Sequence, residues 1–300
     1  MPQPQNRPLV AIGWMLVTGL LFVGVTAVVK HVGSDIPAPQ SAFLRYLLGL
    51  VFLLPMLKAM IEVGLDRSSL KLFTLRGVAH AVGVSLWFYA MTQIPIAEVV
   101  SIGYITPVNV TIAAAIFLGE KLALRRILAV LIALLGALVI LRPGFREISP
   151  GHLAMLANGL FFACSYLIAK IMADRVPAAV VVGWLSIIVT LALAPMAYAV
   201  WVPPTWEDIA WLFLVAALAT AGHFTMTLAL GAAPIAITQP VTFLQLIWAT
   251  MLGALVFAEP VDIWVLLGGA LIVGSVCFIA WREFVLKRRA LTPPVNAAKM

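Results

Sequence analysis

Apolar stretches of roughly 20 residues alternate with short polar or proline- and glycine-rich breaks along the whole chain. A helix of about 20 apolar residues is long enough to cross the hydrocarbon core of a bilayer. The alternation predicts ten such helices, over residues 9–29, 38–58, 72–92, 96–118, 124–141, 150–171, 178–201, 207–230, 235–257 and 262–285. Because the breaks are short, no connection can fold independently, and we expect an all-α membrane protein.

The chain also contains an internal repeat. Residues 139 or 140 positions apart match at several places: Pro95 with Pro234, Glu120 with Glu259, and Lys30 with Lys170. The first five helices therefore correspond to the last five, with one repeat at residues 1–146 and the other at 147–300, including a basic tail at 286–300. Five is an odd number, so the two copies cross the membrane in opposite directions. Inverted repeats are typical of secondary transporters that open to either side in turn.

Positive charge is distributed unevenly over the predicted connections. The chain is 63% hydrophobic and 10% charged, and it has 19 Lys and Arg residues. With the N-terminus in the cytoplasm, Lys30, Arg142 and Arg146 fall outside, Arg45 falls within a span, and all the others fall on the cytoplasmic side. This asymmetry predicts a multi-pass protein of a bacterial inner membrane with both termini cytoplasmic. Membrane orientation thus explains the net positive charge, and no nucleic-acid partner is expected.

An ordered set of short motifs resembles a known family. The motifs are Phe43-Leu44-Arg45-Tyr46, Trp87-Phe88-Tyr89-Ala90, Ile94-Pro95-Ile96-Ala97, Pro107, and Phe117-Leu118-Gly119-Glu120-Lys121. Together with the repeat they resemble the drug/metabolite transporter (DMT) superfamily, EamA family, and within it most of all the bacterial YddG-type exporters of aromatic amino acids. The second copy departs from the pattern, with Ala258 in place of Gly119 and Leu246 in place of Pro107. The resemblance implies ten helices, a central cavity between the repeats and export of small metabolites.

In that family the cavity is expected from helices one, three, four, six, eight and nine. Polar residues in the middle of a span tend to face the protein interior, because facing lipid costs a few kcal/mol. Helical spacing then groups the candidate substrate-binding residues: Thr18 and Phe22; His80 and Trp87; Ser101 and Tyr104; Asn158, Phe162 and Ser165; His223; and Thr242, Gln245 and Trp248. Such a cavity is uncharged and partly aromatic, which suits a zwitterion with an apolar or aromatic side chain.

Each candidate also has a plainer interpretation. Ser and Thr hydroxyls in membrane helices often bond backbone or a neighbouring helix, and mid-span aromatic residues often only pack. The two histidines are either proton carriers or neutral, hydrogen-bonded rings. Glu98 is expected near the outer end of its helix within reach of water, while Glu120, Glu259 and Arg45 are interpreted as structural. Pro95 and Pro234 are candidate gate hinges, or simply end the preceding helices.

The remaining expectations concern the class of function. The sequence has no nucleotide-binding loop, so ATP-driven pumping is not expected, and facilitated diffusion, exchange and proton antiport stay open. No metal site or cofactor is expected. The partners are a small-molecule substrate, such as an amino acid or similar metabolite, and membrane lipid, with a monomer allowed. The alternatives are a multidrug or other metabolite carrier of the same fold and an intramembrane lipid-modifying enzyme. The enzyme ranks low because no paired acids or metal-binding motif occurs at membrane depth.

Overall fold

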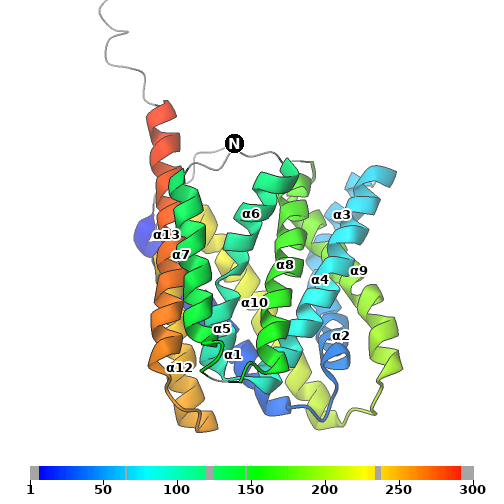
Figure 1. The fold of residues 1–300 in the computed structure, drawn as a ribbon. Helices are drawn as coiled ribbons and strands as arrows, with labels where there is room; N and C mark the ends of the chain where they lie inside the picture. Colours follow the sequence, from blue (N-terminus) through cyan, green and yellow to red (C-terminus); the bar gives the residue numbers. More distant parts are fainter. Residues whose placement is uncertain are drawn as a thin grey trace, which may run out of the picture.

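The structure is a computed structural model that describes residues 7–64, 66–118, 124–145, 147–173, 175–233 and 238–291. Long helices stand side by side across the molecule (Figure 1). In chain order they are α1 (Pro8–Val32), α2 (Ala38–Gly49), η1 (Leu50–Met56), α3 (Leu57–Val63), α4 (Arg67–Gln93), α5 (Ile96–Gly103), α6 (Thr106–Leu118), α7 (Leu124–Leu141), α8 (Pro150–Ala173), α9 (Ala178–Ala199), α10 (Trp206–Ala232), η2 (Gln239–Thr242), α12 (Phe243–Phe257) and α13 (Ile263–Leu291).

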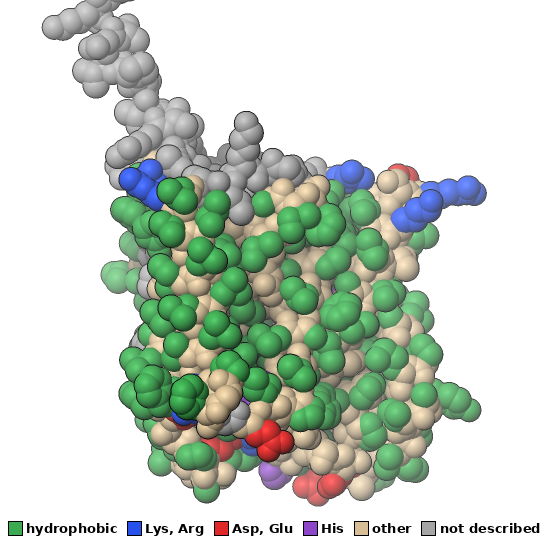
Figure 2. Space-filling model, viewed as in Figure 1, with side chains coloured by type: hydrophobic (Ala, Val, Ile, Leu, Met, Phe, Trp, Pro, Cys, Tyr) green, Lys and Arg blue, Asp and Glu red, His purple; other side chains and the backbone are tan. Residues whose placement is uncertain are grey.

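These elements form the ten expected membrane-crossing segments. Among the described residues, eight helices are long and apolar enough to cross a membrane by length and composition. Of the other two segments, α4 carries polar residues such as Arg76 and His80, and the apolar part of the ninth, Leu244–Phe257, is shorter. Apolar side chains cover the middle of the visible surface, and charged side chains gather at its two ends (Figure 2). The expectation of an all-α membrane protein is confirmed.

Three of the ten segments are broken rather than continuous. The second divides into α2, η1 and α3, with Pro55 inside η1, and the ninth begins with η2. The fourth, predicted as one helix over 96–118, divides into α5 and α6. Pro107 has no N–H to bond the carbonyl of Gly103, and the turn tightens to three-residue bonds from Tyr104 to Ser101 and from Ile105 to Ile102.

The neighbours of each helix follow the inverted repeat. α1 packs along α10, and their counterparts in the other repeat, α8 and α4, pack along each other; α2 pairs with its counterpart α9, and α7 with α13. Lys30, near the end of α1, donates to the carbonyl of Ile94 at 3.1 Å, and Gly151, at the start of α8, packs against the Ile94 side chain. Since α1 ends where α8 begins, the two equivalent helices run in opposite directions.

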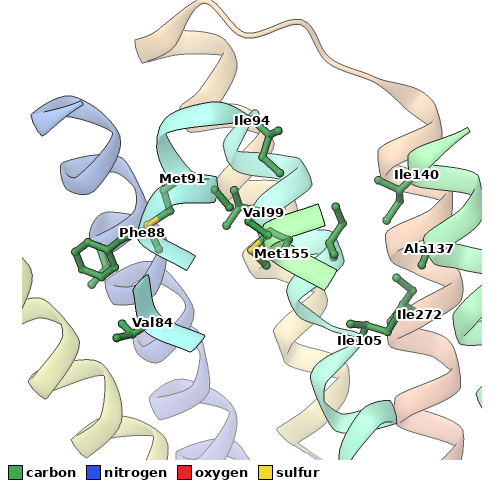
Figure 3. Packing of buried hydrophobic residues seen from close by; sticks show 14 of the residues in the cluster. Val84, Phe88, Met91, Ile94, Val99, Ile105, Ala137, Ile140, Met155 and Ile272 are labelled. Carbon is green, nitrogen blue, oxygen red and sulfur yellow. The ribbon is translucent and has the colours of Figure 1, made fainter. Parts of the chain in front are cut away.

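The main core joins the two repeats. Val84, Phe88 and Met91 of α4 belong to the same buried cluster as Val99 of α5 and Met155 of α8, and Val99 and Met155 lie together near the centre of the view (Figure 3). On the other side of the same view, Ile272 of α13 lies against Ala137 and Ile140 of α7, within the same cluster of buried residues (Figure 3). Lipid is as apolar as these side chains, so close packing rather than the hydrophobic effect holds helices together here.

Candidate functional site

A cavity of about 290 Å³ lies where the two repeats meet. The first repeat contributes α1, α2, α4, α5 and α6 to its wall, and the second contributes α8, α10, η2 and α12. The helices expected from sequence are all represented, and α2 is an addition. Most of the wall is apolar or aromatic, with a few hydroxyl, amide and imidazole groups between the rings.

The structure brings most of the candidate residues together around this cavity. Those that line it are Thr18, Phe22, His80, Trp87, Tyr104, Asn158, Phe162, His223, Thr242 and Gln245. These residues come from α1, α4, α8, α10, η2 and α12 and from the break after α5. A chain that folds as two inverted repeats therefore gathers side chains more than 200 positions apart into one chamber.

Three candidates lie outside the wall. Ser101 is fully buried, and its hydroxyl packs against Gly269 of α13. A Cβ added to Gly269 would lie 3.0 Å from the Ser101 hydroxyl oxygen. Because the helix breaks after Gly103, Ser101 and Tyr104 do not share the predicted face. Ser165 does not line the cavity, and its hydroxyl bonds the ring of His80. Trp248 packs against Gly19, and a Cβ added to Gly19 would lie 2.9 Å from the indole ring.

His80 is at the centre of an aromatic cluster. Its Nδ1 lies 3.1 Å from the Ser165 hydroxyl, and its Nε2 lies 2.9 Å from the hydroxyl of Tyr46. Its ring stacks on Phe162 with centroids 4.7 Å apart and an interplanar angle of 22°. Hydroxyls both donate and accept, so these two partners satisfy a neutral imidazole. The geometry favours the plainer interpretation of His80, a ring held in place as part of the wall.

Several polar side chains of the wall hold the repeats together. The Tyr104 hydroxyl donates to the carbonyl of Thr242 at 2.6 Å, and the Asn158 amide donates to the carbonyl of Gly83 at 2.8 Å. The Thr18 hydroxyl lies 2.9 Å from that of Thr225. Each bond joins the first repeat to the second, because membrane-buried polar groups must find partners inside the protein. These contacts give the polar candidates a packing role at the edge of the cavity.

Sequence reasoning missed Arg45. The sequence predicts a structural role for this residue; in the structure its side chain lines the cavity, and the residue is 9% exposed. Its guanidinium carbon lies 4.0 Å from the centroid of the Tyr46 ring, in a cation–π contact. Tyr46 and Tyr166 also line the cavity and were not candidates. A lone arginine within an apolar span is itself the signal that could have found the site.

Comparison with known proteins identifies the family. Residues 9–142 and 149–281 each match the EamA-like transporter family. The chain belongs to the EamA-like transporter family. One match falls in each half of the chain.

Curated relatives of this EamA-like transporter are themselves transporters. It is 27% identical to a riboflavin transporter of Vibrio cholerae, over 71% of this chain and 72% of that one. It is 26% identical to a pseudopaline exporter of Pseudomonas aeruginosa (67% and 71%) and 23% identical to an S-adenosylmethionine uptake transporter of Rickettsia bellii (69% and 72%). A solved crystal structure shares the fold, with a TM-score of 0.55 and 20% identity over 91% of this chain and 98% of that one.

These findings establish a membrane transporter of small metabolites and not an enzyme. They confirm the DMT superfamily and the EamA family expected from the sequence. The narrower resemblance to YddG-type exporters is not what these relatives indicate, because their names refer to riboflavin, pseudopaline and S-adenosylmethionine.

Among the acidic residues of this EamA-like transporter, Glu98 differs from expectation. Glu98 is buried rather than near water, and its Oε2 lies 2.5 Å from Nε2 of His152 in α8. Glu259 forms a salt bridge with Lys30 and accepts from the amide of Ile96 at 2.9 Å. Glu120 and the candidate hinge Pro234 lie outside the described residues. The other candidate hinge, Pro95, lies between α4 and α5, next to the residues that bond Lys30 and Glu259.

Proposed function

We propose that this transporter exports small aromatic metabolites, with neutral and aromatic amino acids as the first substrate class. The observation that carries the proposal is the aromatic wall of the cavity. Trp87 and Tyr166 flank Phe162 at centroid distances of 6.4 and 5.8 Å, and His80 stacks on the same ring. A planar substrate gains contact area and offset-stacking energy against such a surface.

A second candidate within transport is a planar heteroaromatic metabolite such as riboflavin. The similarity to a riboflavin transporter supports it, and the same aromatic wall suits a fused ring. A broader multidrug carrier of the same fold remains the third candidate. The three candidate functions predict different transported compounds, so one transport assay distinguishes between them.

The mechanism we propose is alternating access. The repeats, taken as residues 1–146 and 147–300, rock against each other around the cavity, with both termini in the cytoplasm. The substrate-binding residues are the candidates that line the cavity, and Pro95 is the proposed hinge of α5 because its missing N–H weakens the local helix ladder. Replacing Pro95 with alanine tests the hinge, and unchanged transport rates would remove it.

Purified protein in liposomes tests the proposed function. Labelled phenylalanine, tryptophan, methionine, threonine and riboflavin, and a labelled lipophilic cation, are offered separately, with and without a pH gradient. We expect saturable transport of tryptophan and phenylalanine, with unlabelled tryptophan competing. Transport of riboflavin alone would favour the second candidate. Transport of the lipophilic cation without any of the other compounds would favour the multidrug carrier and contradict the proposal.

A further inference from the structure

The cavity has an unbalanced charge. Among the described residues that line it, Arg45 is the one side chain with a fixed charge, since its wall contains no aspartate, glutamate or lysine. The polar neighbours are hydroxyls, amides and the rings of His80 and His223. Among the described lining residues, no carboxylate offsets the guanidinium of Arg45.

The contacts that Arg45 makes with the described residues do not use its N–H donors. Among these residues, Arg45 forms a cation–π contact with the ring of Tyr46. That contact covers one face of the planar group, whereas the five N–H donors lie at its edges and need acceptors. A buried charge without partners costs several kcal/mol, and arginines at membrane depth usually face a partner or a substrate pathway.

We propose that Arg45 binds the carboxylate of the substrate. This inference rests on the proposed function and adds the chemical group that the cavity selects. A guanidinium matches a carboxylate with two parallel N–H···O bonds. One fixed positive charge balances one negative charge, so a monocarboxylate fits better than a doubly charged phosphate.

Arg45 is connected to the aromatic wall, which gives the substrate an orientation. Arg45 lies over Tyr46, the Tyr46 hydroxyl bonds His80, and the His80 ring stacks on Phe162. The anion site and the stacking surface are therefore parts of one row of side chains. A substrate with a carboxylate a short distance from a planar ring engages both at once, and one without the carboxylate leaves Arg45 unpaired.

Matched ligands test the proposal on the intact protein in detergent. The equilibrium dissociation constants of tryptophan and indole-3-acetate are compared with those of tryptophanamide and indole-3-acetamide, which have the same rings without the anion. We expect the wild-type protein to bind each carboxylate about tenfold to a hundredfold more tightly than its amide, the usual range for a charge-assisted pair. Equal affinities for acid and amide would overturn the proposal without the use of any variant.

Variants of Arg45 test whether this residue causes the preference for carboxylates over amides. Arg45→Gln is expected to abolish the difference between acid and amide while both still bind, and Arg45→Lys to keep part of it, since the charge stays but the planar fork is lost. Arg67→Gln, the same change at an exposed arginine, is the control and is expected to keep the full preference. A preference that survives in Arg45→Gln would assign the anion site to another residue.

The outcomes separate this inference from the proposed function. If no indole compound binds the wild-type protein, the proposed function fails. If the amides bind as well as the acids, the aromatic cavity stands and the role of Arg45 fails. Flavin mononucleotide and riboflavin form a further pair in which the anion is a phosphate. A larger preference for the phosphate than for the carboxylate would contradict the choice of anion.

Discussion

Asp66 shows how a single residue starts a membrane-crossing helix. It is the N-cap of α4, and its carboxylate accepts the amide of Ser69 at 3.1 Å. Such a cap satisfies one of the backbone donors that the first turn leaves unpaired. Hydrogen bonds from the Ser69 side chain and amide hold the pKa of Asp66 below its ordinary value of 3.8.

The lowered pKa of Asp66 predicts how its contribution to stability depends on pH. The native state favours the charged carboxylate, so its contribution is present above the pKa of the unfolded chain and is lost as the pH falls through the native pKa. We expect Asp66→Ala to lower the melting temperature at neutral pH and to match the wild type at strongly acid pH. Thermal melts of the detergent-solubilised protein at both pH values check this. An equal difference at both would contradict it.

At the level of single residues, the sequence predicts many of the residues that line the cavity, but not the charged residue among them, Arg45. Mid-span polar residues such as Asn158 and Gln245 were found because lipid exposure would be costly. Arg45 was missed because a long side chain near a helix end can also reach the interface, and sequence does not say which way it points. Glu98 was placed near water for the same reason, yet its partner His152 comes from the other repeat.

The crossing of α7 and α13 shows how elements are fitted together. A Cβ on Gly136 would lie 2.7 Å from the carbonyl oxygen of Gly268, and one on Gly268 would meet Gly136 in turn. The two backbones touch, an approach that membrane helices achieve with small residues. These helices are the fifth of each repeat, so the contact also holds the repeats together.

A larger residue at this crossing is expected to destabilise the protein. Gly136→Leu forces the helices apart and should cost about 1–3 kcal/mol, the usual range for overpacking. Gly274→Leu in α13 is the control, because a Cβ there meets no atom within 4 Å. Melting temperatures in detergent measure both. Equal stability of the two variants would show that the crossing tolerates a side chain.

The ten segments were predictable, because apolar length and Pro/Gly breaks are strong signals. Their internal breaks were not predicted. Pro107 lies in the first turn of α6, where proline is tolerated, so it could have been interpreted as a sign of a new helix start. The competing signal is the mostly apolar stretch from Ile96 to Leu118, which has the length of one membrane span.

At the scale of the whole molecule, one end carries several bonds between the repeats. Lys30 of α1 pairs with Glu259, and Arg142 pairs with Asp262. The Gln40 amide and the backbone of Val202 bond each other in both directions, at 2.6 and 2.8 Å. The repeats must move relative to each other for alternating access, so these bonds oppose opening at this end.

Breaking the Lys30–Glu259 pair is expected to lower the free energy of unfolding. Their side chains are 19% and 10% exposed, so Lys30→Met leaves a mostly buried carboxylate and should cost about 3 kcal/mol. The exchange Lys30→Glu with Glu259→Lys should recover part of this. Lys58→Met, which breaks an exposed pair with Glu62, is the control and should cost less than about 0.5 kcal/mol. No recovery in the exchanged protein would show that the two charges do not act as a pair.

The central claim is that substrate crosses through the cavity between the repeats, and blocking that cavity tests it most directly. Gly103 lies in the cavity wall, and a Cβ there meets only the end of Met155 at 3.7 Å, so Gly103→Phe introduces a ring at this wall without a clash at its Cβ. Gly13→Phe makes the same change on an exposed face of α1, where a Cβ meets no atom within 4 Å.

The measurement is counterflow of labelled tryptophan into liposomes loaded with unlabelled tryptophan. We predict saturable counterflow for the wild type and Gly13→Phe, and only the level of protein-free liposomes for a folded Gly103→Phe. Wild-type counterflow through Gly103→Phe would contradict the account, because the substrate would then take a path outside this cavity.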